Sequence, residues 1–418
     1  MKKYRLLVLL CSSFVLYLSA VAATVPAQIK PVRDLKPTVI LLSLDGFRAD
    51  YLEKYPSPNL NELARTGVRA KWLIPSFPSK TFPNHYTMAT GLYPEHHGIV
   101  ENNVYDFGAI FKIDRLEEVE NPRWWLGEPI WVTAEKQKQI AASYFFPGSS
   151  TAIEGVKPSY YRTFNGKVPN EMRVEKLLAW FDLPAEKRPT MMTLYFSDVD
   201  DAGHEFSPDA EETGYAVRNV DRLVGLLYDG LKQRKIADKV NLIIVSDHGM
   251  ASVNQSNIVN LEDYFDLKDA EQILWTGEIV QIFPKENKLD EIAAQLKSVK
   301  NATCWKKAEI PERLHYNEGN RIAPIVCSAN EGWILTNSER FKDAQKRENF
   351  NRPVGAHGYD NQLASMRALF IAHGAAFRKN KVAEPFANVE IYNLMCRILG
   401  LTPAKNDGNF DNVKNLLK

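Results

Sequence analysis

Three hydrophobic segments of the chain run into an aspartate at or shortly after their end. The segments and their aspartates are residues 38–44 with Asp45, residues 191–196 with Asp200, and residues 241–246 with Asp247. If these segments are strands of an open α/β sheet, their carboxyl ends form the edge at which ligands bind. Three carboxylates gathered there would repel one another unless a cation lay between them. The pattern therefore predicts a metal site at the carboxyl edge of a parallel sheet.

Histidines close to these aspartates indicate which metal would bind. His204 follows Asp200 by four positions, a spacing that brings both side chains to one side of a helical turn. His248 is adjacent to Asp247, and His357 lies between alanine and glycine in a glycine-flanked segment that permits close backbone approach. Histidines among carboxylates favour zinc over magnesium or calcium. Together with Asp45, these residues suit two metal ions, which typically hold a phosphoryl group between attacking and leaving oxygens.

A candidate nucleophile lies in the proline-rich segment 75–85, which we expect to lead into a helix over about residues 84–90. Thr81 is in this segment, where a helix N-terminus would direct backbone amides at an anion. A nearby metal can activate a threonine hydroxyl. A lone threonine more often caps a helix, and a lone strand-end aspartate more often forms a turn. The prediction rests on the coincidence of all these residues.

Strand and helix patterns alternate along the chain and are separated by turn residues. We therefore predict a doubly wound α/β fold, with a mostly parallel central sheet flanked by helices. Residues 58–65 are expected to form a helix that ends at Gly67, and residues 218–232 to form another. Residues 367–372 are expected to form a further buried strand. Residues 258–351 are richer in charges and short alternating runs, and we predict that they form a smaller inserted subdomain.

Composition excludes some classes of partner. The chain has 418 residues, of which 45% are hydrophobic and 25% charged, as expected for a folded globular protein. Its formal net charge of +1 provides no general attraction to nucleic acid or to an anionic membrane. Any anionic substrate must therefore be attracted locally, and a metal site can do this.

The first 22 residues are predicted to be a signal peptide. A short basic start precedes an apolar stretch over about residues 6–18, and residues 20–22 form a small-x-small cleavage site. A retained membrane anchor is the alternative, but the apolar stretch is short for a membrane span. We therefore expect an exported protein with no membrane span after cleavage. In an oxidising compartment Cys304 and Cys327 could form a disulfide, whereas Cys396 is expected to be a buried thiol.

Several short motifs resemble those of one known family. They are Lys80–His85, Gly91–Pro94, His97–Ile99, Asp200–His204, Ser246–Gly249 and Gly355–Tyr359. With them, the chain resembles the nucleotide pyrophosphatase/phosphodiesterase family of the alkaline phosphatase superfamily, over one catalytic domain of residues 30–418. The resemblance implies an alkaline-phosphatase-like fold with two zinc ions. It also implies a threonine nucleophile that forms a covalent nucleotidyl intermediate, which water later hydrolyses.

The resemblance also assigns roles to individual residues. It implies one zinc ion held by Asp45, Asp247 and His248, with Thr81 bound to it, and a second held by Asp200, His204 and His357. Asn102 matches an asparagine that donates to a phosphate oxygen beside the backbone amide of Phe82. Such a neutral donor, in place of an arginine, suits a phosphodiester, which carries one charge fewer than a monoester.

The resemblance further implies an aromatic pocket for a nucleobase. Phe82 and Phe164 match the two side chains that enclose the base, and Phe146 and Tyr195 match aromatic positions that line the pocket. Phe164 stands where several relatives have tyrosine, so stacking is kept and a hydroxyl is lost. Without the resemblance, aromatic residues at these places would be assigned to the core.

The sequence therefore predicts an exported two-zinc phosphodiesterase. It would hydrolyse phosphodiester or pyrophosphate bonds of small nucleotides, rather than bind a nucleic-acid duplex, and release nucleoside 5′-monophosphates through a Thr81-linked intermediate. We expect it in a bacterial periplasm, or secreted. The alternatives are a phospholipid- or phosphocholine-directed phosphodiesterase of the same superfamily, and a catalytically inactive extracellular binding protein. The preferred base, the leaving group and the oligomeric state stay open.

Overall fold

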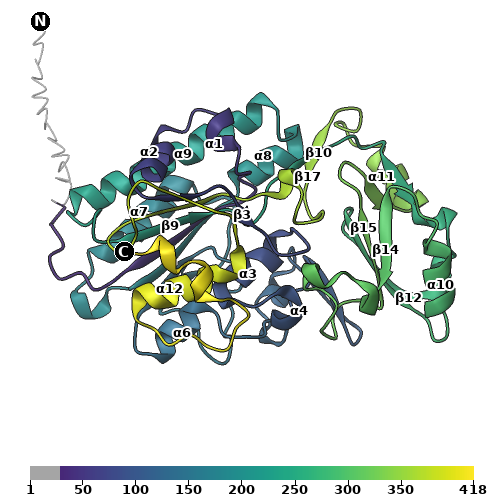
Figure 1. The fold of residues 1–418 in the computed structure, drawn as a ribbon, viewed down its shortest axis with the longest axis horizontal. Coiled ribbons are helices and arrows are strands. Elements are labelled where there is room, and N and C mark those ends of the chain that lie inside the picture. Colours follow the sequence, from purple (N-terminus) through teal and green to yellow (C-terminus); the bar gives the residue numbers. More distant parts are fainter. Residues whose placement is uncertain (1–28) are drawn as a thin grey trace, which may run out of the picture.

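An eight-stranded sheet forms the centre of the molecule (Figure 1). The computed structural model describes residues 29–418, so the predicted signal peptide, residues 1–22, lies outside the described residues. In spatial order the strands are β19 (Lys381–Ala383), β2 (Val68–Ala70), β18 (Phe370–His373), β9 (Asn241–Val245), β1 (Val39–Leu44), β8 (Met191–Phe196), β6 (Ala141–Tyr144) and β7 (Tyr160–Arg162). The five strands from β9 to β7 are parallel, and β18 runs antiparallel to both of its neighbours. The predicted α/β fold with a mostly parallel sheet is confirmed.

The strands are buried on both faces, which explains their continuous apolar sequences. In β1, Val39 and Leu41 belong to one buried cluster, whereas Ile40 and Leu42 belong to another on the opposite face. Helices cover both faces, as Figure 1 shows. One face is covered by α1 (Tyr51–Lys54), α2 (Pro58–Thr66), α7 (Asn170–Phe181), α8 (Asp198–Phe206) and α9 (Glu211–Gln233), and the other by α3 (Thr81–Thr90), α6 (Ile130–Lys136) and α12 (Ile391–Leu399).

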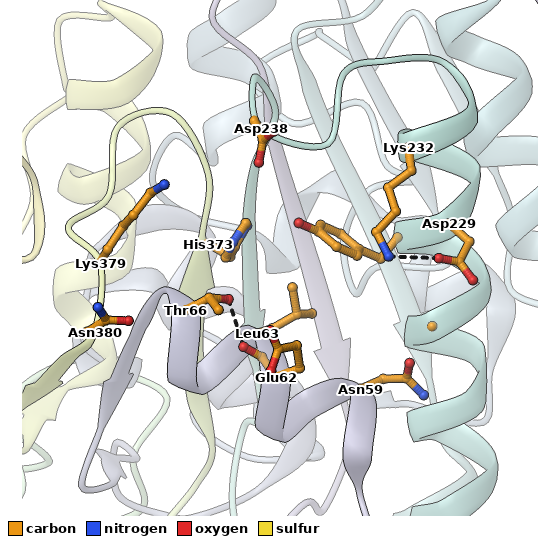
Figure 2. A pocket seen from close by; sticks show the side chains of 12 residues that line it. Asn59, Glu62, Leu63, Thr66, Asp229, Lys232, Asp238, His373, Lys379 and Asn380 are labelled. Carbon is orange, nitrogen blue, oxygen red and sulfur yellow. Dashed lines mark hydrogen bonds and ion pairs between the residues drawn. The ribbon is translucent and has the colours of Figure 1, made fainter.

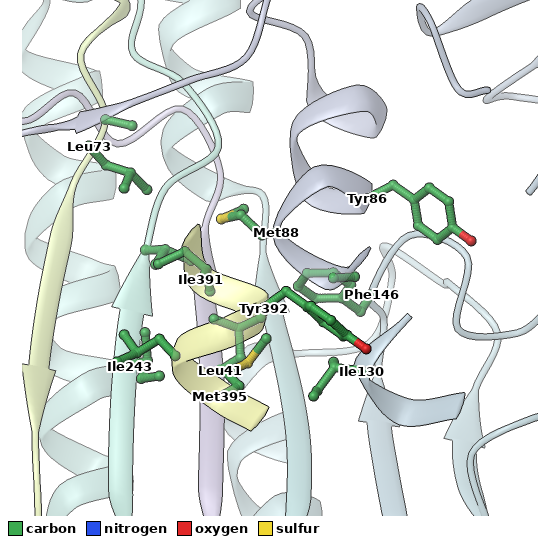
Figure 3. Packing of buried hydrophobic residues seen from close by; sticks show 14 of the residues in the cluster. Leu41, Leu73, Tyr86, Met88, Ile130, Phe146, Ile243, Ile391, Tyr392 and Met395 are labelled. Atoms are coloured by element: carbon green, nitrogen blue, oxygen red, sulfur yellow. The ribbon is translucent and has the colours of Figure 1, made fainter. Parts of the chain in front are cut away.

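The second of these layers holds the helix that carries Thr81. Figure 3 shows Met88 of α3, Met395 of α12, and Leu41 and Ile243 of the sheet, which all belong to one buried cluster. Because such interiors are close-packed, α3 has little freedom to shift relative to the strand ends. The core therefore fixes the position of the nucleophile candidate relative to the predicted metal ligands.

Residues between β9 and β18 form a second, smaller sheet. It is antiparallel and contains, in spatial order, β12 (Ala270–Trp275), β13 (Ile279–Pro284), β15 (Ile325–Ala329) and β14 (Ala302–Lys306). It has a buried cluster of its own, to which α10 (Leu289–Leu296) contributes. Cys304 and Cys327 face each other across β14 and β15 and form the expected disulfide, and Cys396 is a buried free thiol. The boundaries 258–351 of the inserted subdomain stay a prediction.

Short elements complete the described chain. The remaining helices are α4 (Pro94–His97), α5 (Leu116–Val119) and α11 (Ser338–Ala344), and the remaining strands are β3 (Leu73–Ile74), β4 (Asn103–Asp106), β5 (Ala109–Lys112), β10 (Ala251–Val253), β11 (Ile258–Asn260), β16 (Ile334–Thr336), β17 (Val354–Ala356) and β20 (Phe386–Ala387). Within residues 29–418, no helix combines the length and apolar character that crossing a bilayer requires.

Two predicted helices differ in extent from those observed. The predicted helix at residues 218–232 is part of the longer α9, while α2 ends at Gly67 as expected. Helix α3 begins at Thr81 and not near residue 84. Pro83 suggested the later start, but a proline in the first turn costs nothing because its missing N–H would have no partner inside the helix. The earlier start puts Thr81 at the N-terminus of the helix.

Gly46 follows Asp45 and allows β1 and α8 to approach each other. Its φ is +66°, and a Cβ atom there would lie 2.9 Å from Asp200 Cα. We expect Gly46→Ala to lower the free energy of unfolding by about 3 kcal/mol, since backbone strain and a backbone clash add together. Gly400→Ala is the matched control, because Gly400 has φ +67° and open space around it. It should cost only ~1 kcal/mol. Equal losses in urea unfolding would show that contact with Asp200 is unimportant.

Candidate two-metal active site

The ends of β1 and β9 bring together three of the predicted metal ligands. Asp45 follows β1, and Asp247 and His248 follow β9, so adjacent parallel strands present them at one edge. All three side chains are buried, and their ligand atoms lie within 4.8 Å of one another. His248 Nε2 is 3.0 Å from Asp247 Oδ2 and 3.4 Å from Asp45 Oδ1. We refer to Asp45, Asp247 and His248 as the first ligand group.

Asp200, His204 and His357 form a second ligand group, whose atoms also lie within 4.8 Å of one another. Asp200 lies in the first turn of α8 rather than at the strand end itself, and His204 follows it one turn later. Asp200 Oδ1 is 3.5 Å from His204 Nε2 and 3.6 Å from His357 Nε2. The rings of His357 and His248 stack with 3.5 Å between centroids, so the two groups are adjacent.

The histidines are oriented as metal ligands. In each of them Nδ1 lies close to a backbone carbonyl oxygen: 2.9 Å from Gly355 for His204, 2.9 Å from Gly249 for His248, and 2.8 Å from Ser79 for His357. A carbonyl only accepts hydrogen bonds, so Nδ1 carries the proton in each ring. The neutral form of each imidazole then presents the lone pair of Nε2 to its ligand group.

The carboxylates also fit a metal pair. Asp45 Oδ1, Asp200 Oδ1 and Asp247 Oδ2 are buried, and none of them accepts a hydrogen bond within residues 29–418. A buried carboxylate oxygen without a partner is costly, and each of these oxygens points into its ligand group. One cation in each group would satisfy all three oxygens. The residues present therefore fit two metal ions.

Charge in the two groups is unevenly distributed. Burial raises the pKa of Asp45, and the nearby carboxylates of Asp247 and Asp200 raise it further. Burial also raises the pKa of Asp247, but the imidazoles of His248 and His85 outweigh this and lower it overall. Burial and the neighbouring histidines lower the pKa of His357, which keeps this ring neutral, as a metal ligand must be.

Thr81 lies next to the first ligand group. Its Oγ1 is 3.3 Å from His248 Nε2, at the N-terminus of α3. Asn102 lies beside it, because the Phe82 amide donates a 3.0 Å hydrogen bond to Asn102 Oδ1. The two predicted phosphate donors, the Asn102 side chain and the Phe82 backbone amide, therefore lie together. The Phe82 N–H, however, is already bonded to Asn102 Oδ1. The Asn102 amide group keeps its own N–H donors for a phosphate.

Two further side chains hold the first ligand group in position. The Tyr195 hydroxyl donates a 2.6 Å hydrogen bond to Asp45 Oδ2, a role beyond the pocket lining predicted for it. His85 Nδ1 lies 2.9 Å from the Thr81 carbonyl and 3.4 Å from Asp247 Oδ2, and its Nε2 lies 2.7 Å from Ser43 Oγ. No role for His85 was predicted from the sequence, although its spacing of four from Thr81 was a usable signal.

The turn between β12 and β13 contacts the site from the smaller sheet. Glu278 forms a buried ion pair with Lys80, the residue before Thr81. Thr276 donates a 2.8 Å hydrogen bond to Glu101 Oε1, and Glu101 precedes Asn102. No local pattern predicts these contacts, because the partners are 198 and 175 residues apart in the chain. Both residues next to the predicted catalytic pair are therefore held by the same turn.

A cavity of about 440 Å³ opens beside Thr81. All four aromatic residues predicted to line a base pocket line this cavity, together with Asp45 and Asp200. They are Phe82, Phe146, Phe164 and Tyr195. Phe164 is 56% exposed, whereas Phe146 and Tyr195 are buried. We call this space the aromatic cavity.

Another cavity, of about 390 Å³, contains none of the predicted ligands (Figure 2). Its walls carry charges of both signs, including the Lys232–Asp229 ion pair and Glu62. His373, on its wall, pairs with Leu242 near the start of β9, whereas Asp247 follows the end of that strand. This cavity is therefore at the opposite end of the sheet from the ligand groups.

Comparisons with known proteins show the family of this chain. The model of the family described as type I phosphodiesterase/nucleotide pyrophosphatase matches residues 39–360. The chain belongs to this family. It is 39% identical over 393 residues to a venom phosphodiesterase of Crotalus durissus collilineatus, covering 91% of this chain and 46% of that protein. It is also 39% identical over 396 residues to ectonucleotide pyrophosphatase/phosphodiesterase family member 3 of Rattus norvegicus, covering 92% and 44%.

The fold agrees with a solved member of the family. Murine ectonucleotide pyrophosphatase/phosphodiesterase 5 superposes with a TM-score of 0.84 at 36% identity, covering 91% of this chain and 100% of that chain. An inactive variant of the murine protein has been solved in complex with AMP. The present chain spans about half the length of the curated relatives it matches.

Removing one carboxylate should have opposite effects with and without metal. In the metal-free protein, the raised pKa of Asp45 stabilises the fold at low pH, and this contribution is lost as pH rises through that pKa. Asp45→Asn removes the buried charge, so at neutral pH we expect the metal-free variant to be about 1 kcal/mol, or ~2 °C, more stable than the metal-free parent. With zinc added, the parent should gain stability and the variant far less. Thermal unfolding with chelator and with zinc tests both effects. A variant stabilised by zinc as much as the parent would remove Asp45 from the ligands.

The Lys80–Glu278 pair should show strong coupling. Replacing one partner leaves the other charge buried, so Lys80→Met or Glu278→Leu should each cost about 3 kcal/mol. The double variant should cost much less than the sum of the two single changes, because no unpaired charge remains. Urea unfolding of all four proteins measures this. Glu286→Leu is the control at an exposed glutamate of the same region, and additive losses would contradict the coupling.

Proposed function

We propose that this protein is a two-zinc phosphodiesterase that hydrolyses nucleotide phosphodiester or pyrophosphate bonds and releases nucleoside 5′-monophosphates. The observation that carries the proposal is the position of Thr81, which adjoins both the first ligand group and the aromatic cavity. The same residue can thus reach the phosphorus of a nucleotide whose base lies among the aromatic side chains. The names of the relatives, and the AMP complex of the murine protein, support a nucleotide substrate.

The residues of the chain divide the reaction into two steps. The base binds in the aromatic cavity, where Phe82 and Phe164 offer ring faces. Thr81 Oγ1 gives up its proton to solvent and forms a bond to phosphorus as the bond to the leaving group breaks, which gives a nucleotidyl ester of Thr81. Water then cleaves this ester, releases the nucleoside 5′-monophosphate and restores the threonine hydroxyl. Asn102 donates to a phosphoryl oxygen in both steps.

Zinc is the proposed metal in both groups. The first group combines two carboxylates with one histidine and the second combines one carboxylate with two histidines, ligand sets that suit zinc better than magnesium or calcium. When bound, the ions supply positive charge that stabilises the phosphoryl oxygens and the attacking and leaving groups. Tyr195 and the three carbonyl oxygens that accept from histidine Nδ1 keep the ligands oriented.

We also propose that the protein is exported, into the periplasm if the host is a bacterium. The predicted signal peptide and the Cys304–Cys327 disulfide support an oxidising compartment outside the cytoplasm. Relatives named as venom and ectonucleotide enzymes support the same location. The comparisons favour neither the lipid-directed alternative nor the inactive binding protein.

Thr81→Ala should abolish turnover while nucleotide binding remains. For hydrolysis of the p-nitrophenyl ester of thymidine 5′-monophosphate, we expect kcat to fall at least a thousand-fold, because the variant lacks the hydroxyl on which the covalent ester forms. Thr81→Ser keeps the hydroxyl and should retain measurable activity. Metal analysis of both variants should give two zinc ions per chain. Full turnover by Thr81→Ala would exclude Thr81 as the nucleophile. In a separate comparison with the parent enzyme, faster cleavage of a lipid head-group ester than of the nucleotide ester would favour the lipid-directed alternative.

A further inference from the structure

A second cavity, of about 440 Å³, adjoins the second ligand group. His204 lines it, and so do Trp275 and Glu278 of the β12–β13 region, with Arg340 and Arg347 from α11 and the residues after it. It shares no lining residue with the aromatic cavity, which is bordered by Asp200 of the same ligand group. Because Asp200 Oδ1 and His204 Nε2 are 3.5 Å apart, both cavities adjoin the second ligand group. We call this space the arginine cavity.

The arginine cavity carries unpaired positive charge. Within residues 29–418, neither Arg340 nor Arg347 forms an ion pair with a carboxylate, and both side chains are exposed. Arg340 donates one 3.5 Å hydrogen bond to the carbonyl oxygen of Trp275. Glu278 is an acidic residue of the lining, but its carboxylate is already paired with Lys80. Guanidinium groups bind phosphate oxygens with two parallel hydrogen bonds. The cavity can therefore accept a phosphorylated group.

The same wall offers apolar and aromatic surface. Trp275 is only partly buried, and the guanidinium of Arg340 lies 6.0 Å from the centre of its ring. Phe341 and Ile334 also line the cavity. A planar ring attached to a phosphate could contact Trp275 while the arginines bind the phosphate. The lining thus suits a nucleoside phosphate better than an inorganic anion alone.

The direction of the reaction connects this cavity to the site. In phosphoryl transfer the attacking and leaving oxygens lie roughly in line on opposite sides of phosphorus. Thr81 lies against His248 of the first ligand group, so the leaving group departs on the side of the second ligand group. His204 of that group lines the arginine cavity. A large leaving group is therefore directed into this space.

We propose that the arginine cavity is a binding site for the leaving half of the substrate when that half is a nucleoside phosphate or polyphosphate. Arg340 and Arg347 bind its phosphates and Trp275 contacts its base. This inference rests on the proposed function. It adds a specificity site separate from the base pocket, lined mostly by residues that follow β11 (Ile258–Asn260).

Two substrates test the proposal. Both transfer a nucleoside monophosphate, but their leaving groups differ. The leaving group of diadenosine tetraphosphate is a nucleoside polyphosphate, whereas that of the p-nitrophenyl ester of thymidine 5′-monophosphate is p-nitrophenol, which has no phosphate and no nucleoside. In the zinc-loaded enzyme, the Arg340→Ala/Arg347→Ala double variant should lower kcat/KM for diadenosine tetraphosphate by about 10- to 100-fold, mainly through KM. Hydrolysis of the p-nitrophenyl ester should change less than about twofold. Lys342→Ala is the matched control, because Lys342 is exposed on α11 and does not line the cavity.

A binding measurement separates failure of this proposal from failure of the proposed function. In the Thr81→Ala background, calorimetry should show tighter binding of diadenosine tetraphosphate than of AMP. Adding the arginine double substitution should reduce the ratio of the two affinities at least tenfold. An unchanged ratio would overturn the arginine cavity as a subsite. Absence of p-nitrophenyl ester hydrolysis by the parent would instead contradict the proposed function, and the binding ratio would still decide the subsite.

Discussion

Three aspartate carboxylates are held together at the carboxyl edge of the central sheet, two of them fully buried. Asp45 and Asp247 are buried, and one oxygen of each, like one oxygen of Asp200, has no hydrogen-bond donor within the described residues. Without a cation, repulsion is relieved in part by protons, as the raised pKa of Asp45 indicates. The fold therefore holds the carboxylates close together at a cost in folding free energy, and a bound metal would offset that cost. Stability, metal affinity and catalysis depend on the same few atoms.

The scaffold supports this arrangement with backbone groups more than with further charges. Three carbonyl oxygens orient the histidine rings, and parallel pairing of β1 with β8 and β9 aligns the strand ends that carry the aspartates. Gly46 permits the close approach of Asp200. Such supports are rigid because they belong to packed regular structure. The ligands are thus positioned by the packed scaffold itself.

The smaller sheet contributes residues that contact the active-site region. Through Glu278 and Thr276, one turn holds Lys80 and Glu101, which are adjacent to Thr81 and Asn102. The same region supplies Trp275 to the arginine cavity. The turn that holds the residues next to Thr81 and Asn102 thus also borders the proposed site for the leaving half of the substrate. Positioning of the nucleophile and choice of the leaving group are in this way coupled through one short turn.

The sequence by itself determined the α/β class, the strand-end aspartates and their histidines, and Thr81 with its aromatic neighbour. These features are local: each depends on residue type and on spacings of a few positions. The start of α3 was predicted three residues too late. The helix begins at Thr81 because Pro83 is compatible with the first turn of a helix. Only the tertiary structure decided which carbonyl orients each histidine, that Tyr195 binds Asp45, and that Glu278 pairs with Lys80. Those partners are 150 or more residues apart in most cases, and nothing in a local pattern records which distant segments the packed core brings into contact.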